Sequence, residues 1–377
     1  MFNPFILLIL HKRILIKTKL YCHMKSLVRI AALSLALSAA AANVAAERIP
    51  ASDPQINYMG RIHWDDKGHG SFNYPGTSAL LRFKGTSLQM ETSPGSGKFI
   101  VEVDDMAPAQ VTYTSADSIL TVADGLDDTE HSVRITYAIE GYEFHPQFRA
   151  FHTDGTLLPA GDKPALKIEF IGNSITCGYG IEDDNPANGF TYDTENHTLT
   201  YAHLTGRALG ADVNIVARSG IGIYRNYGSP RQGDIRTMPH EYDYTMLYDH
   251  EHPWDATRFI PDIICINLGT NDMSEGNYDI DLYEAHYRSF LRHLRELYPE
   301  AEIVLLTGAM LQGEDLQKVR GVLDRLAAKD DGFHRFDMSP QTGELGYGAA
   351  YHPSRLQARK MADELTAYLT ALLRESR

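Results

Sequence analysis

A change in hydrophobic periodicity near residue 160 limits the possible folds of this 377-residue chain more than any other feature. From about residue 47, apolar and polar residues alternate in short runs such as Phe99–Val103, separated by turn-forming Gly, Pro and Asp. After Gly161-Asp162-Lys163-Pro164, apolar strand-like runs alternate with stretches of helical period. The pattern predicts an antiparallel β-sandwich over residues 47–160 and an α/β domain over residues 161–377.

The second region predicts a parallel sheet covered by helices on both faces, because strands and helices alternate along it. The predicted strands are 166–171, 213–217, 263–268, 303–307 and 333–337, and the predicted helices are 200–209, 282–298, 315–329 and 354–373. In such sheets the chemistry lies at the carboxyl ends of the strands. Polar residues just after these strands are therefore the candidates for a functional site.

The overall composition is that of a globular protein, with 43% hydrophobic and 22% charged residues. The chain has 35 Lys and Arg against 49 Asp and Glu, which gives a net charge of −14. Nucleic-acid binding needs clustered positive charge, so the balance argues against a nucleic-acid partner.

Residues 1–46 have the pattern of an N-terminal extension followed by a signal peptide. They contain six Lys or Arg and no Asp or Glu. A basic segment after Met24 precedes an apolar stretch from Ile30, and Val44-Ala45-Ala46 offers small residues for cleavage. The pattern predicts a secreted or periplasmic protein that keeps no membrane segment. A retained anchor is the alternative, although the apolar stretch is shorter than the roughly 20 residues of a membrane span.

The cysteines do not form the framework of a disulfide-rich protein. Cys22 lies in the predicted signal region, and Cys177 and Cys265 are 88 positions apart. Two such distant cysteines, one of them inside an apolar strand-like run, predict buried free thiols.

Four residues that could serve a functional site follow predicted strands or precede the last predicted helix. Ser174, at the start of a helix, is either a helix cap or lies where backbone N–H groups can stabilise a developing oxyanion. Asn271 belongs either to a plain turn or to an oxyanion site, to which its side-chain N–H₂ could donate. Gly220 is either a plain loop residue or a point where the backbone approaches a ligand closely. His352 is either a loop histidine or a general base.

Taken together, these motifs resemble the SGNH (GDSL) hydrolases. The similar blocks are Gly172-Asn173-Ser174-Ile175, Ser219-Gly220, Gly269-Thr270-Asn271-Asp272 and His352. Within that superfamily the chain is most similar to the family 2 carbohydrate esterases, which remove acetyl groups from plant polysaccharides. The supporting segments are Met59-Gly60-Arg61, Ala123-Asp124-Gly125-Leu126 with His131, and Ser174-Ile175-Thr176-Cys177-Gly178-Tyr179-Gly180.

The resemblance implies a three-layer α/β/α hydrolase domain after a jelly-roll β-sandwich. It implies that Ser174 is the nucleophile and His352 the general base. It places the oxyanion hole at the backbone N–H groups of Ser174 and Gly220 and the side chain of Asn271. We expect no cofactor and no metal.

The chain departs from the superfamily pattern three residues before the histidine, where Ala349 replaces the usual Asp. Three explanations stay open. A backbone carbonyl could orient the imidazole of His352, as in some members of the resembled family, a distant carboxylate could do so, or the site could be degraded. We expect the carbonyl.

Two weaker patterns remain. Trp254, Tyr192 and Tyr201 are candidates for a sugar-stacking cleft, although aromatic residues also fill cores. His240-Glu241 and Asp249-His250-Glu251-His252 have no structural zinc spacing and no helical period that would bring them together. We therefore expect a solvated loop and no metal there.

The sequence thus predicts a serine esterase that deacetylates xylan, glucomannan or a related polysaccharide. One rival is an SGNH esterase for small or lipid-like esters. The other is a non-catalytic carbohydrate-binding protein with a decayed site. The polysaccharide, the hydroxyl position and the oligomeric state are left open by the sequence.

Overall fold

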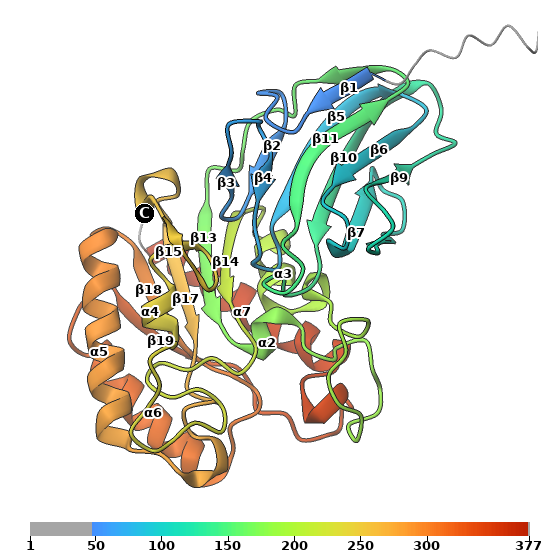
Figure 1. Cartoon of the computed structure of the whole chain (residues 1–377). Helices are drawn as coiled ribbons and strands as arrows, with labels where there is room; N and C mark the ends of the chain where they lie inside the picture. Colours follow the sequence, from blue (N-terminus) through green and yellow to red (C-terminus); the bar gives the residue numbers. More distant parts are fainter. Residues whose placement is uncertain (1–46, 376–377) are drawn as a thin grey trace, which may run out of the picture. The chain divides into compact units, whose positions relative to one another are not determined.

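The computed structural model describes residues 47–375 (Figure 1). The predicted extension and signal peptide, residues 1–46, lie outside the described residues. The first part of the described chain forms two antiparallel sheets, and the second part forms a parallel sheet with helices. The predicted fold class is therefore confirmed. No helix within residues 47–375 has both the length and the apolar character needed to cross a membrane.

The antiparallel part consists of short strands. They are β1 (Glu47–Pro50), β2 (Asn57–Met59), β3 (His63–Trp64), β4 (Gly70–Ser71), β5 (Ser78–Gly85), β6 (Leu88–Thr92), β7 (Gly97–Val103), β8 (Ala109–Tyr113), β9 (Ile119–Ala123), β10 (Thr129–Tyr137), β11 (Gln147–Thr153) and β12 (Thr156–Leu158). One sheet has the order β3-β4-β11-β6-β9, with β1 beside β11. The other has the order β12-β5-β10-β7-β8, with β2 beside β5.

Alternating side chains build the sandwich core. On β10, Val133 and Ile135 are buried, and the strand lies between β5 and β7. Phe99 of β7 meets Phe148 of the opposite sheet, with ring centroids 6.2 Å apart. The period of two in the sequence therefore marks the side chains that face the other sheet.

The second part is a doubly wound parallel sheet. Its strands are β13 (Lys167–Gly172), β14 (Asp212–Ala217), β17 (Ile263–Asn267), β18 (Glu302–Thr307) and β19 (Phe333–Asp337), in the order β14-β13-β17-β18-β19. Its helices are α2 (Ser174–Cys177), α3 (Tyr201–Ala208), α4 (Met238–Glu241), α5 (Ile280–Leu297), α6 (Gly313–Ala327) and α7 (Arg355–Glu375). A hairpin of β15 (Tyr244–Met246) and β16 (Asp249–Pro253) precedes β17, and short 3₁₀ turns span His197–Leu199, Ala256–Arg258, Ser274–Gly276 and Ala349–Tyr351.

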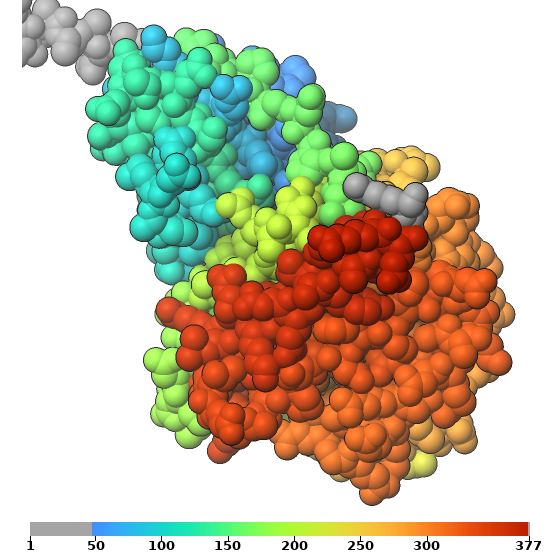
Figure 2. Space-filling view, turned by 180° about the vertical axis from the view of Figure 1, so that it is seen from behind, coloured from blue at the N-terminus to red at the C-terminus, as the bar shows by residue number. Residues whose placement is uncertain are grey.

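Each face of the parallel sheet has its own core. Ile168 and Phe170 of β13 pack with residues of α3 and α7, whereas Ile171 packs with residues of α5 and α6. Figure 2 shows the C-terminal residues of α7 in red beside the yellow-green segment near residue 210. Cys177 and Cys265 are buried and free, as predicted, and both belong to the α3–α7 core.

A buried ion pair joins the sandwich to the parallel sheet. Nη2 of Arg61, which follows β2, lies 3.2 Å from Oε1 of Glu169 on β13, and both side chains are fully buried. The Arg61 guanidinium also donates to the backbone oxygens of Tyr242 and Tyr244. The Tyr242 hydroxyl donates to the same glutamate. Because each charge has hydrogen-bond partners, the pair can be buried. Replacing either residue would leave the other charge unpaired and strongly lower the free energy of unfolding.

Arg61→Met should lower the free energy of unfolding by about 3–5 kcal/mol, because Glu169 then keeps a buried charge without its cation. Arg82→Met is the matched control, since Arg82 pairs with Glu130 at the exposed surface of the sandwich. That change should cost less than about 1 kcal/mol. Denaturant titration of the two variants measures the difference, and equal losses would contradict a special role for the buried pair.

Candidate active site

The candidate site lies where the strand order of the parallel sheet reverses. β13 lies between β14 on one side and β17 on the other. Ser174 follows β13, Gly220 follows β14 and Asn271 follows β17. The carboxyl ends of parallel strands lie at one edge of the sheet. The three predicted blocks therefore lie together at the crevice where the strand order reverses.

Ser174 is the first residue of α2, and it does not cap that helix. The N-cap is Asn173, whose side-chain oxygen accepts a hydrogen bond from the Ile175 backbone N–H. The interpretation of Ser174 as a plain helix cap is therefore wrong. Its Oγ instead lies 2.9 Å from Nε2 of His352, 178 residues away in the chain.

The other nitrogen of His352 faces backbone carbonyls. Nδ1 lies 3.2 Å from the oxygen of Ala349 and 3.2 Å from that of Ala350. A carbonyl oxygen only accepts, so Nδ1 carries the proton and Nε2 is left as the acceptor for Ser174. Within residues 47–375 no carboxylate is hydrogen-bonded to this imidazole. The carbonyls thus occupy the position of the missing Asp.

The loop before His352 adopts an unusual backbone to present these carbonyls. Ala350 and Tyr351 have φ of 48° and 58°, in the left-handed region that non-glycine residues seldom adopt. Ala349 is fully buried, and its N–H donates to the Gly180 oxygen at 3.0 Å. A carboxylate side chain at position 349 would have to fit into the buried contact between this residue and Gly180.

The environment of His352 keeps it neutral. Its ring stacks on Tyr179 with centroids 4.0 Å apart and planes 19° apart. Burial lowers the pKa of His352 to about 4, against the opposing effect of the two carbonyls. A neutral imidazole is the form that can accept a proton.

Two backbone N–H groups near Ser174 are available to a ligand. In the loop after β14, the N–H of Ser219 donates to Glu140, and that of Gly222 donates to Asn226. The N–H groups of Gly220 and Ser174 form no hydrogen bond with any described residue. Gly220 has φ of 79°, a conformation that suits glycine.

The third block is locked to the second by its own side chains. Nδ2 of Asn271 donates to the Ile221 oxygen at 2.8 Å, which fixes the amide and leaves it a second N–H. The buried carboxylate of Asp272 accepts backbone N–H bonds from Ile223, Tyr224 and Arg225. Burial raises the pKa of Asp272 to about 6, while these bonds act in the opposite direction. Asp272 is thus an orienting residue.

A buried carboxyl pair below the site escaped the sequence analysis. Oε1 of Glu140, in the loop after β10, accepts the Ser219 N–H at 2.7 Å. Oε2 of Glu195 accepts the Glu140 N–H at 3.1 Å. Burial and the neighbouring Glu140 carboxylate raise the pKa of Glu195, so it favours its neutral form. Only the tertiary structure brings these residues together, and their local sequence carries no signal for it.

The predicted sugar-stacking aromatics do not form one exposed surface, and two of them are corrected: Tyr201 lines the small cavity against Ser174 but is buried, and Trp254 lies elsewhere. Tyr201 is fully buried, and its hydroxyl lies 2.9 Å from the Thr176 hydroxyl. Trp254 packs on the guanidinium of Arg61, toward the amino end of β13 and away from Ser174. The predictions for Tyr201 and Trp254 failed because hydrophobic periodicity in the sequence does not show which aromatic side chain faces a cleft.

Tyr192 belongs to an aromatic row that reaches His352. Its ring packs against Phe190 at 4.8 Å, Phe190 packs against Tyr179 at 4.7 Å, and Tyr179 stacks on the imidazole. Two further tyrosines near the site were missed. Tyr227, whose N–H donates to the Gly220 oxygen, is 67% exposed, and Tyr351 is 59% exposed.

The histidine-rich segment after the second block is not simply a solvated loop. Glu241 is fully buried, and His240 and His250 both contact its carboxylate. The expectation of a solvated loop is wrong for Glu241, because the β15–β16 hairpin brings His250 to the end of α4.

Known families match both parts of the chain. Residues 58–160 match the family described as "Carbohydrate esterase 2 N-terminal", and residues 170–360 match the "GDSL-like Lipase/Acylhydrolase family". The chain is 31% identical to an acetylxylan esterase/glucomannan deacetylase of Cellvibrio japonicus, over 86% of this chain and 91% of that protein. It is 32% identical to the cellulase/esterase CelE of Acetivibrio thermocellus, over 84% of this chain but only 39% of that protein.

Solved structures agree with the sequence relatives. A family two carbohydrate esterase from Cellvibrio japonicus superimposes with a TM-score of 0.81 at 28% identity, covering 88% of this chain and 99% of that chain. One from Clostridium thermocellum, in complex with cellohexaose, gives 0.78 at 32% identity, covering 84% and 99%.

The fold and the site blocks define an ester hydrolase of the SGNH type. More narrowly, the chain belongs to the family 2 carbohydrate esterases.

Proposed function

We propose that this protein removes O-acetyl groups from plant cell-wall polysaccharides such as xylan and glucomannan, with Ser174 as nucleophile and His352 as general base. The observation that carries the proposal is the 2.9 Å contact between Ser174 Oγ and His352 Nε2. The carbonyls at Nδ1 hold the imidazole in the tautomer that this reaction needs.

The reaction proceeds in two acyl transfers. Ser174 Oγ attacks the acetyl carbonyl carbon while its proton passes to His352 Nε2. The bond from the acetyl carbon to the sugar oxygen then breaks, and Nε2 returns the proton to that oxygen. Water attacks the acetyl-serine in the same way, its proton passes through His352 back to Ser174 Oγ, and acetate leaves.

The developing oxyanion needs hydrogen-bond donors fixed in advance. The N–H groups of Ser174 and Gly220 and the second N–H of Asn271 fill this role. Glu140 acts as a positioning residue, because it holds the neighbouring Ser219 N–H at 2.7 Å and so fixes the loop that carries Gly220. Through Glu140, the β-sandwich contributes to the hydrolase site.

Two features support a small acyl group on a sugar. A cavity lined by Ser174, Tyr201 and Met361 has a volume of about 10 Å³, about that of one water, so it is not itself a tunnel for a long acyl chain. The exposed tyrosines at positions 227 and 351 provide aromatic faces on which sugar rings can stack. The relatives named for acetylxylan and glucomannan, and the neighbour bound to cellohexaose, point to the same substrate class.

The proposal includes export. The basic and apolar pattern of residues 24–46 supports secretion or passage to the periplasm, where a polymeric substrate can be reached. No nucleic acid or cofactor enters the proposed reaction.

The test is acetate release from acetylated xylan and acetylated glucomannan, with aryl acetate and aryl butyrate measured alongside. Ser174→Ala and His352→Ala should each lower kcat by more than about 10³-fold, because both groups take part in every proton transfer. Ser115→Ala, an exposed serine of the sandwich, should leave kcat unchanged.

Each rival gives a different result in that assay. Faster turnover of butyrate than acetate, with no release from polysaccharide, would favour an esterase of lipid-like esters. Polysaccharide binding without acetate release, equal in the wild type and Ser174→Ala, would favour a binding protein. Either outcome would overturn the proposal.

The acid limit of activity should lie well below the ordinary histidine range. The base is active when neutral, so kcat/KM should fall as the pH drops through the pKa of His352, about 4, rather than through about 6.5. Rates with aryl acetate between pH 3.5 and 8 measure this limb, and circular dichroism at each pH verifies folding. If kcat/KM of the folded protein instead fell near pH 6.5, the result would contradict a lowered pKa for His352.

Glu140→Ala should lower kcat by about 10- to 10²-fold with little change in KM, because the loop that carries Gly220 loses its anchor. Complete loss of one oxyanion donor lowers kcat by about 10²–10³-fold, and a displaced donor should cost less. Glu140→Gln should recover most of the rate, since an amide oxygen still accepts from Ser219. Glu130→Ala, an exposed carboxylate of the same sandwich, is the control. A purely structural role would instead lower stability equally in both Glu140 variants and leave kcat of the folded fraction unchanged.

A further inference from the structure

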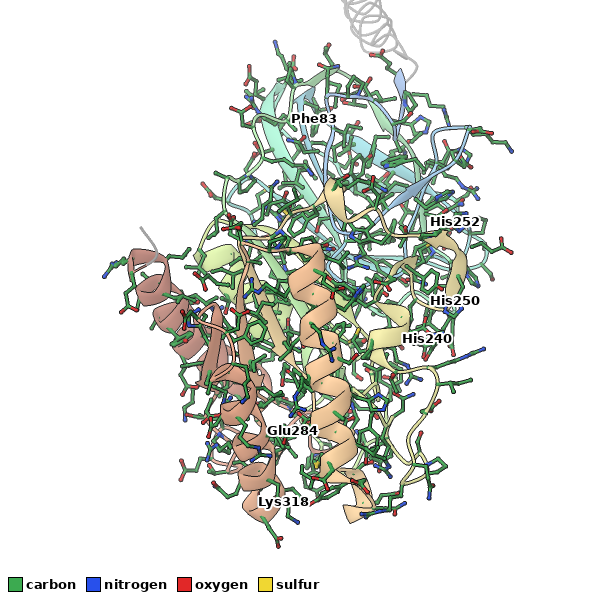
Figure 3. The ribbon with its side chains drawn as sticks, turned by 90° about the vertical axis from the view of Figure 1, so that its left-hand side faces the viewer. Phe83, His240, His250, His252, Glu284 and Lys318 are labelled. Carbon is green, nitrogen blue, oxygen red and sulfur yellow. The ribbon has the colours of Figure 1, made fainter. Side chains whose placement is uncertain are left out.

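A buried carboxylate held between two imidazoles lies outside the proposed active site. Glu241, the last residue of α4, is fully buried. Its Oε1 lies 3.1 Å from Nδ1 of His240, and its Oε2 lies 3.0 Å from Nε2 of His250. Figure 3 shows His240 and His250 on the same side of the molecule, one above the other. The three ligand atoms all lie within 4.8 Å of one another.

The hairpin after α4 creates this arrangement. β16 pairs antiparallel with β15, with a register shift, and the turn between them contains Tyr248 at φ of 63°. The N–H of Tyr248 donates to Oε2 of Glu241 at 3.0 Å. Tyr244 stacks on the ring of His250 with centroids 4.3 Å apart. The carboxylate and one imidazole are therefore held in place by neighbours that are not themselves ligands.

The charge of Glu241 has only imidazoles as ion-pair partners among the described residues. The guanidiniums of Arg218 and Arg236 lie over the Tyr248 ring, at 5.8 and 5.3 Å from its centroid. A buried carboxylate is costly unless a cation or strong hydrogen bonds compensate it.

We propose that His240, Glu241 and His250 bind a divalent transition metal, with Zn²⁺ as the occupant. Two imidazole nitrogens and one carboxylate oxygen form a donor set that zinc uses in proteins, with water in the fourth position. Nδ1 of His240 and Nε2 of His250 lie 3.1 and 3.0 Å from opposite oxygens of Glu241, and the three ligand atoms lie within 4.8 Å of one another. Bonds of about 2.0–2.1 Å in a tetrahedron place ligand atoms about 3.3 Å apart, so the exposed imidazoles would close by up to about 1.5 Å on the ion. Mg²⁺ and Ca²⁺ prefer oxygen ligands and should not compete.

The exposure of the imidazoles gives the ion a route of entry. His240 and His250 side chains are 47% and 38% exposed, while the carboxylate behind them is fully buried. A bound ion would tie α4 to the β15–β16 hairpin, in the segment that connects the Gly220 loop to β17. The expected role is to stabilise this segment, because a ligand that binds only the folded state raises its stability.

The experiment is Zn²⁺ titration of the full chain, without a histidine tag and after treatment with a chelator. Isothermal calorimetry should show one ion per chain, and Zn²⁺ should raise the thermal midpoint while Mg²⁺ should not. Co²⁺ in place of Zn²⁺ should give the visible absorption of a four-coordinate site. His240→Ala and His250→Ala should each weaken binding at least about 100-fold, because each removes a ligand.

His252→Ala is the matched control, since Nδ1 of His252 pairs with Asp249 and the residue lies outside the ligand set. It should bind Zn²⁺ like the wild type. Both ligand variants replace partly exposed side chains, so each is expected to fold, and circular dichroism verifies this. No binding by the wild type at 0.1 mM Zn²⁺ (roughly the weak limit for a specific site) would overturn the proposal. Equal binding by the wild type and the His240→Ala/His250→Ala double variant would overturn it as well.

Discussion

The proposed chemistry of this chain depends on how the half-buried imidazole of His352 is held. For that role His352 must be neutral, carry its proton on Nδ1 and reach Ser174, yet none of the four residues before it, 348–351, is a carboxylate. Two backbone carbonyls meet these requirements, at the cost of placing Ala350 and Tyr351 in left-handed conformations. Such residues cost about 1–3 kcal/mol each, and they persist only where the surroundings fix them. The buried Ala349, bonded to Gly180, supplies that restraint.

The β-sandwich is integrated with the hydrolase sheet at both ends of the parallel strands. Arg61 neutralises Glu169 near the amino end of β13, and Glu140 holds the loop after the carboxyl end of β14. The first contact fixes the position of the sheet, and the second reaches the proposed oxyanion site. Because both involve buried charged or acidic groups, a small displacement of the sandwich would leave polar groups unpaired. The sandwich is therefore part of the architecture of the proposed active site.

Local sequence patterns predicted much of this structure, because burial leaves a period in the chain. They located the strands, the helices and the polar residues at strand ends, and the rule for parallel sheets brought Ser174, Gly220 and Asn271 to one edge. They could not give contacts that depend on long-range packing. Glu140 meets a residue 79 positions away, and a hairpin brings His250 to Glu241. Tyr201 and Trp254 were misplaced for the same reason, since an aromatic residue looks alike in a core and in a cleft.

The most direct test of this account is the tautomer of His352, observed by NMR on protein with ¹⁵N-labelled histidine at pH 7. The resonance is assigned by its loss in His352→Gln. His197, whose buried Nδ1 lies 2.8 Å from the Thr176 oxygen, is an internal reference for the same tautomer. The account predicts a neutral ring with the proton on Nδ1 and a bare Nε2 facing Ser174. A proton on Nε2 of the neutral ring, or a charged imidazolium at pH 7, would contradict it.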